Sequence, residues 1–217
     1  MLTVLALPLA LLAMQQQAIA DRLAGRVSPD IAALVGELGT AAAARGLPVD
    51  PLIQKAIEGS AKGIPAERVA AAVRLVAMQL DTAAGALRHS GLAADTVAVA
   101  AGAFAITAGL NGRDIAQLAR SGAQASEIIV GLRVAGTLVA LGVPRAETVM
   151  LVNATLQSGR PAGELLALPG QVQAAMAKGA APAQAAAGLA RAAAAQARRG
   201  PPPGHGRPAH PPPPPHP

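Results

Sequence analysis

Hydrophobic and polar positions between residues 21 and 200 recur with the period of a helix, and no convincing strand alternation interrupts them. The clearest face follows Pro65, where Val69, Val73, Val76 and Leu80 recur at helical spacing. Charged residues form an opposite stripe seven apart, at Glu67, Arg74, Asp81 and Arg88. The pattern predicts an amphipathic helix over 65–88 that places Leu80 in the core.

A recurring Gly-x-Pro tripeptide divides this region. It stands at Gly46-Leu47-Pro48, Gly63-Ile64-Pro65, Gly142-Val143-Pro144 and Gly159-Arg160-Pro161. Glycine suits the left-handed residue that ends a helix, and proline suits the first position of the next. Each tripeptide therefore predicts a tight corner between helices. The predicted helices are 29–45, 51–62, 65–88, 94–110, 113–121, 124–141, 144–158, 161–168, 171–178 and 182–199.

The expected fold is all-α, an array or an irregular bundle of about ten Ala-rich helices. An ungapped match of Gly63–Arg74 to Gly122–Arg133, with Gly, Ala and Arg identities, favours stacked helical units. The segment Thr96–Gly112 carries no charge. It predicts a central buried helix, with a membrane span as the alternative, although its composition is mostly Ala, Gly and Thr.

Composition narrows the classes of site that the chain can hold. Of its 217 residues 52% are hydrophobic, yet Cys, Trp and Tyr are missing and Phe104 is the single aromatic residue. Disulfides, thiolate metal sites and thiol nucleophiles are therefore excluded. The net charge of +6 is scattered along the chain. Without basic runs or stacking aromatics, no nucleic-acid partner is expected.

The first twenty residues predict a signal peptide. Leu2–Met14 form a mainly apolar run without charge, and Ala18-Ile19-Ala20 places small residues before a cleavage point at Asp21. No Lys or Arg precedes the run, so an uncleaved anchor or a buried first helix remains the alternative. The prediction is a bacterial protein exported to the periplasm or secreted, with a helical domain over 21–200 and membrane contact only through the signal segment.

The last residues, 201–217, form a Pro/His-rich tail that is expected to be disordered. It carries His205, His210 and His216, whose imidazoles could bind nickel, copper or zinc. Metal or ligand handling through this tail is therefore an alternative function. The irregular spacing favours a solvated tail over a built metal site.

Candidate catalytic residues are few. His89 is the one histidine outside the tail, beside Ser90 and before Asp95. No nucleophile-elbow or metalloprotease motif accompanies it, and a histidine at a helix end is favoured by the helix dipole. We expect no enzyme and no cofactor, with a hydrolase using His89 as a distant alternative.

The densest charged patch is a candidate interaction surface, with a lattice of surface ion pairs as the plainer interpretation. It comprises Lys55, Glu58, Lys62, Glu67 and Arg68. The surrounding run KAIEGSAKGIPAERV, Lys55–Val69, resembles a segment of uncharacterised exported helical proteins of bacteria. The resemblance implies export and an all-helical domain, and it implies no activity. The expected function is an exported, non-enzymatic structural or protein-interaction module with an unidentified protein partner in the cell envelope.

Overall fold

The computed structural model describes residues 6–159 and 161–199, and these form ten helices without a strand. The first five are α1 (Ala6–Leu23), α2 (Pro29–Ala44), α3 (Asp50–Ala61), α4 (Ala66–His89) and α5 (Thr96–Ala108). The second five are α6 (Gly112–Ala119), α7 (Ala125–Ala140), α8 (Arg145–Gln157), α9 (Ala162–Ala177) and α10 (Pro182–Arg199). The predicted all-α fold is confirmed. The tail over 201–217 lies outside the described residues.

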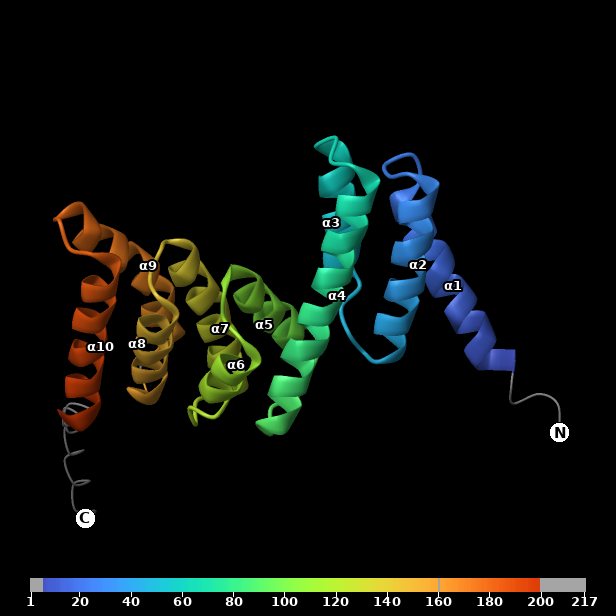
Figure 1. The fold of residues 1–217 in the computed structure, drawn as a ribbon. Coiled ribbons are helices and arrows are strands. Elements are labelled where there is room, and N and C mark those ends of the chain that lie inside the picture. The colour runs from blue at the N-terminus through green and yellow to red at the C-terminus, as the bar shows by residue number, and fades with distance from the viewer. Residues whose placement is uncertain (1–5, 160, 200–217) are drawn as a thin grey trace, which may run out of the picture.

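The helices form an elongated two-row stack, with α1 and α10 at opposite ends (Figure 1). Each helix packs against the helix that follows it in the chain. With one exception, each helix also packs against the second helix after it, as α5 does against α7. Odd-numbered helices therefore make one row and even-numbered helices the other. This pattern of neighbour contacts is that of a helical solenoid, so the array is confirmed and an irregular bundle is not what forms.

The exception is the step from α3 to α5, which no extensive contact joins. Helix α4 spans this break because it has 24 residues. Its first half contacts α3 where Val69 packs on Gly59, and its second half contacts α5 where Ala83 packs on Gly102. Helix α4 thus connects two shorter stacks.

The Gly-x-Pro corners end helices as predicted. Gly46 and Gly142 adopt positive φ angles of 71° and 88°, which favour glycine. After Gly46, the Leu47 amide donates to the Ala42 carbonyl at 3.0 Å, the long bond of a Schellman motif. Leu47 is itself buried. Leu47, between Gly46 and Pro48, therefore folds back onto the helix that has just ended.

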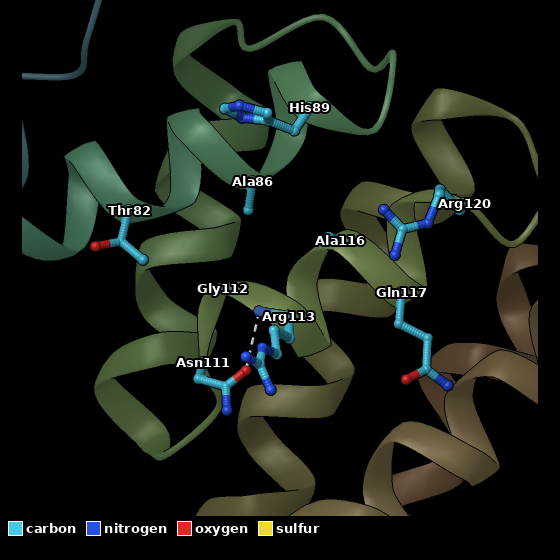
Figure 2. Close-up of a pocket in the computed structure, with 9 residues that line it drawn as sticks. All are labelled: Thr82, Ala86, His89, Asn111, Gly112, Arg113, Ala116, Gln117 and Arg120. Carbon is cyan, nitrogen blue, oxygen red and sulfur yellow. Dashed lines mark hydrogen bonds between the residues drawn. The ribbon is translucent and has the colours of Figure 1, made fainter.

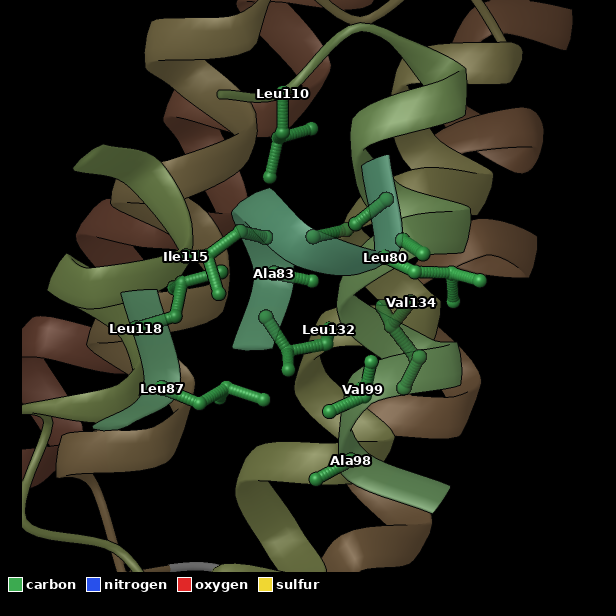
Figure 3. Close-up of a cluster of buried hydrophobic side chains, with 14 of the residues drawn as sticks. Leu80, Ala83, Leu87, Ala98, Val99, Leu110, Ile115, Leu118, Leu132 and Val134 are labelled. Carbon is green, nitrogen blue, oxygen red and sulfur yellow. The ribbon is translucent and has the colours of Figure 1, made fainter. Parts of the chain in front are cut away.

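Small residues let the helices approach closely in the core. A methyl group on Gly136 of α7 would lie 2.6 Å from the Phe104 ring of α5, and one on Gly102 would lie 3.0 Å from Ala83. Side chains of α4, α5, α6 and α7 meet in one cluster (Figure 3). Leu80 is fully buried there, as predicted.

One predicted break between helices was wrong. The predicted helices 161–168 and 171–178 are a single helix, α9, with Pro169 inside it. Proline normally weakens a helix interior because it lacks an N–H. Here Leu165, Leu168 and Val172 are buried along one side of α9, so packing on both sides of the proline holds the helix together.

The weak sequence repeat does not describe the structural unit either. It pairs α4 with α7, and these helices lie in opposite rows of the stack. Two helices, one from each row, are the unit that recurs.

The uncharged segment forms α5 and the turn after it. Helix α5 is central and buries Val99, Ala101 and Ala105, as expected for a core helix. Among the described residues one helix, α4, is long and apolar enough to cross a membrane, and 28% of that stretch is buried within the protein.

Helix α1 runs without a break through the predicted cleavage point between Ala20 and Asp21. Ile19 and Leu23 are buried, and a methyl group on Gly39 of α2 would lie 2.9 Å from Ile19 Cδ1. In this structure the end of α1 therefore packs with the helical domain. Export and the boundary at residue 21 stay predictions.

Candidate functional site

The predicted charged patch centres on one clamped carboxylate. Lys62 Nζ donates to Glu58 Oε1 at 2.5 Å, and Lys55 Nζ donates to Glu58 Oε2 at 3.1 Å. These two hydrogen bonds, that from Lys62 foremost, and the two ammonium charges lower the pKa of Glu58 from 4.5 to about 2. The surface ion pairs that the plainer interpretation expects are therefore formed between Glu58 and the two lysines.

Four of the five predicted residues line one small cavity of about 150 Å³. They are Lys55, Glu58, Lys62 and Arg68. Glu67 is exposed in the first turn of α4 and does not line the cavity. Glu58 is shared by two lysines, and exposed pairs of this kind contribute little stability. Lys55, Glu58 and Lys62 therefore form a surface ion-pair cluster beside the corner. The role of the five-residue patch as an interaction surface stays a prediction.

A larger groove, of about 940 Å³, lies between the end of α4 and α6 (Figure 2). Helix α4 contributes Thr82, Ala86 and His89. The α6 side contributes Asn111, Gly112, Arg113, Ala116, Gln117 and Arg120. Sequence reasoning missed this groove, and we call it the α4–α6 groove.

A capping box fixes the orientation of α6. Asn111 Oδ1 accepts from the Arg113 and Asp114 amides at 2.9 and 3.1 Å, and Asp114 Oδ2 accepts from the Asn111 amide at 2.9 Å. Arg113 and Arg120 are seven positions apart, which places both on one face of the helix end. The local sequence thereby directs two guanidinium groups into the same groove.

The groove is electropositive because cationic groups line it and carboxylates do not. Within the described parts of the chain, neither Arg113 nor Arg120 forms an ion pair. Asp114, the acidic residue of α6, lies on the side of α8, where Arg145 Nε approaches its Oδ2 at 3.4 Å. Two unpaired guanidinium groups that share one face are well suited to carboxylates or other anions.

His89, Ser90 and Asp95 do not form a catalytic triad. His89 Nδ1 lies 2.6 Å from the Gly85 carbonyl, which makes it the protonated nitrogen. The Ser90 hydroxyl donates to the carbonyls of Ala86 and Ala116, and Asp95 caps α5 by accepting from two backbone amides. The hydrolase alternative therefore lacks its nucleophile–base hydrogen bond.

A second groove, of about 450 Å³, flanks α6 on its other side, against α8. Gln117 lines both grooves, and Asn153 and Gln157 add further amides on the α8 side. Asn153 Oδ1 is buried without a hydrogen-bond partner. Its amide can rotate toward a ligand without losing a hydrogen bond at that oxygen.

Within residues 6–159 and 161–199 no cluster of three or more His, Asp or Glu side chains could hold a metal ion. The candidate ligands His205, His210 and His216 lie outside the described residues.

One signal in the sequence could have located the groove. Asn111 and Asp114 have the spacing of a capping box, which predicts a helix start, and the two arginines that follow this start are seven positions from each other. The sequence does not predict which helix lies across the groove from α6. The end of α4 comes beside α6 only through the packing of the even-numbered row.

Comparison with known proteins adds no relative: no protein-family model, no curated protein and no solved structure matches this chain.

Proposed function

We propose that the protein is an exported, non-catalytic interaction module whose α4–α6 groove binds an acidic segment of a partner protein. The observation that carries the proposal concerns the guanidinium groups of Arg113 and Arg120: they form no ion pair with any described residue, and no carboxylate stands among the described residues that line their groove. Export rests on the predicted signal segment and on the resemblance of Lys55–Val69.

The chemistry of the groove supports binding more than turnover. Its polar side chains include the donors of Asn111, Arg113, Gln117 and Arg120, and the one hydroxyl among the described lining residues, that of Thr82, already donates to the Met78 carbonyl. Arginine is always charged, so the groove attracts carboxylates over the whole physiological pH range. Side-chain amides at Asn111 and Gln117 can add hydrogen bonds to a peptide main chain.

A solenoid also provides the rigid frame that such a surface needs. Stacked helix pairs present extended surfaces on which solenoid proteins bind their ligands. Helix α6 is held at its start by the capping box and along its length by buried Ile115 and Leu118. Arg113 is therefore carried by a fixed helix, and Arg120 is the C-cap residue at its end.

The test is selection of random 12-residue peptides, displayed on phage, against the purified full chain. We expect enrichment of Asp and Glu in the selected peptides and loss of that enrichment against Arg113→Gln/Arg120→Gln. The matched control is Arg74→Gln/Arg133→Gln, which removes the same charge from two exposed arginines outside the groove. Binding of selected peptides should also weaken as salt rises, because exposed charges are screened.

Two results would overturn the proposal. One is the selection of peptides without acidic enrichment. The other is acidic enrichment that the control pair removes as completely as the groove pair, because the net charge of the chain would then be the cause. Circular dichroism of each variant shows whether the helices are retained.

A further inference from the structure

Next to the groove, α4 exposes two large apolar side chains that none of the described helices covers. Leu75 is 50% exposed and Met78 is 58% exposed. They are three positions apart and therefore neighbours on the helix surface. A single exposed apolar residue is ordinary, whereas an adjoining pair beside a binding groove requires an explanation.

The apolar pair and the groove lie on the same face of α4. Leu75, Met78 and Thr82 follow one another at i, i+3 and i+7, and Ala86 and His89 continue the row. Thr82, Ala86 and His89 are the three α4 residues of the groove. The apolar pair is therefore a direct continuation of the groove wall toward the start of α4.

Contacts between the helices set the order of groups along this row. A methyl group on Gly112 would lie 3.3 Å from Thr82 Cγ2, and Ser90 Oγ donates to the Ala116 carbonyl at 3.3 Å. Helix α6 therefore runs beside the last turns of α4 in the same direction. Arg113 follows Gly112 at the Thr82 end of the groove, and Arg120 lies toward the His89 end (Figure 2). The apolar pair continues α4 beyond the Thr82 end.

We infer that the segment bound in the α4–α6 groove is amphipathic: a bulky aliphatic side chain sits on Leu75 and Met78, and two acidic side chains meet Arg113 and Arg120. Leu75 and Thr82 are about 10 Å apart along the helix axis, as are the two arginines. An extended peptide covers about 10 Å in three residues. The bound sequence then has an aliphatic residue, an acidic residue about three positions away, and a second acidic residue about three positions further on.

This inference rests on the proposed function and commits to a partner protein. An anionic membrane would offer the same two chemistries, apolar and negative. A lipid headgroup layer is a broad surface, however, and the two arginines lie in a hollow of about 940 Å³ beside α6. A narrow chain reaches both of them and the apolar pair together.

The experiment repeats the phage selection with Leu75→Gln/Met78→Gln as the bait. Both residues are exposed, so the variant is expected to fold. The matched control is Leu166→Gln on α9, whose side chain is 64% exposed in the other row of helices. Wild type and control should select acidic peptides with an aliphatic residue at the stated spacing. The double variant should keep the acidic selection and lose the aliphatic position. A wild-type-selected peptide should bind it about tenfold more weakly.

Each other result decides against the inference. Acidic peptides without a positioned aliphatic residue, or equal affinity for the double variant, would overturn it while the proposed function stands. Selection without acidic residues would overturn both. Co-sedimentation with phosphatidylcholine–phosphatidylglycerol vesicles that the same double variant abolishes, in the absence of any selected peptide, would assign the surface to a membrane.

Discussion

Replacing Leu80 by Ala should destabilise the protein by about 2–5 kcal/mol, the range found when a buried leucine leaves a cavity. Leu80 is fully buried in the middle of α4, in the cluster that α4 forms with α5, α6 and α7 (Figure 3). This core contains almost no aromatic side chain, so each buried leucine supplies a large share of its apolar volume. Helix α4 also joins the two halves of the stack, so damage there affects both.

A second substitution on the same helix isolates the effect of burial. Leu75→Ala makes the same chemical change five positions earlier, at a side chain that is 50% exposed. Both variants change helix propensity equally, in favour of alanine. The exposed site should change stability by about 0.5 kcal/mol or less. The difference between the two variants therefore measures what is lost in the core.

Thermal unfolding followed by circular dichroism at 222 nm is the suitable assay, because the chain has no Trp or Tyr to report by fluorescence. For a domain of this size each kcal/mol lowers Tm by about 2–4 °C, so Leu80→Ala should lower it by about 4–20 °C. Leu75→Ala should leave it within about 2 °C. Equal midpoints for the two variants would refute the placement of Leu80 in the core.

Three further predictions concern the ends of helices and the charged patch. Asp95→Ala should lower the free energy of unfolding, measured with urea, by about 1 kcal/mol, because the Asp95 side chain accepts two backbone hydrogen bonds at the start of α5. Ser28→Ala should lower it by less, because the Ser28 side chain makes no such bond at the start of α2. Gly142→Ala should destabilise the protein by about 1–2 kcal/mol, because the φ of 88° at this position is unfavourable for alanine. Gly85→Ala should stabilise the protein by about 0.5–1 kcal/mol, because Gly85 lies inside α4 with open space around it. NMR titration should show the Glu58 carboxylate protonating at about pH 2. Its contribution to the free energy of unfolding is then fully present above pH 4.5 and is lost as the pH falls toward 2. High salt should raise the pKa of Glu58, because it screens the two lysine charges.

Most of the fold could be predicted because local rules set the corners. A left-handed glycine ends a helix whatever the tertiary contacts are, and Gly46 and Gly142 behave accordingly. The proline of the tripeptide stands just before the next helix and not at its first position: Pro144 is the N-cap of α8, and Pro48 precedes the N-cap of α3. The prediction failed at Pro169, where the same kind of rule indicated a break. Burial of Leu165, Leu168 and Val172 on one face outweighed the lost hydrogen bond, and such long-range packing is not visible in a local pattern.

The candidate site, too, could be predicted from the sequence only in part. The Lys55–Glu58–Lys62 cluster could be predicted because its partners are three and four positions apart on one helix. The α4–α6 groove could not, because His89 and Arg120 are far apart in the sequence and become neighbours through the even-numbered row. Charge density along the chain thus indicated the cluster whose charges are already paired, and it overlooked the arginines that are free to bind.

The length of α6 explains why the apolar pair beside the groove is exposed. Helix α6 has 8 residues, whereas its neighbours in the same row, α4 and α8, have 24 and 13. A short helix between two longer ones leaves part of each neighbour uncovered. Because α6 begins where Gly112 meets Thr82, it does not cover the earlier turn of α4 that carries Leu75 and Met78. Gln117 of α6 lines the grooves on both sides of this helix. On the α4 side, Arg113 and Arg120 line the groove that adjoins the uncovered apolar pair, so the short helix places its cationic groups beside that pair.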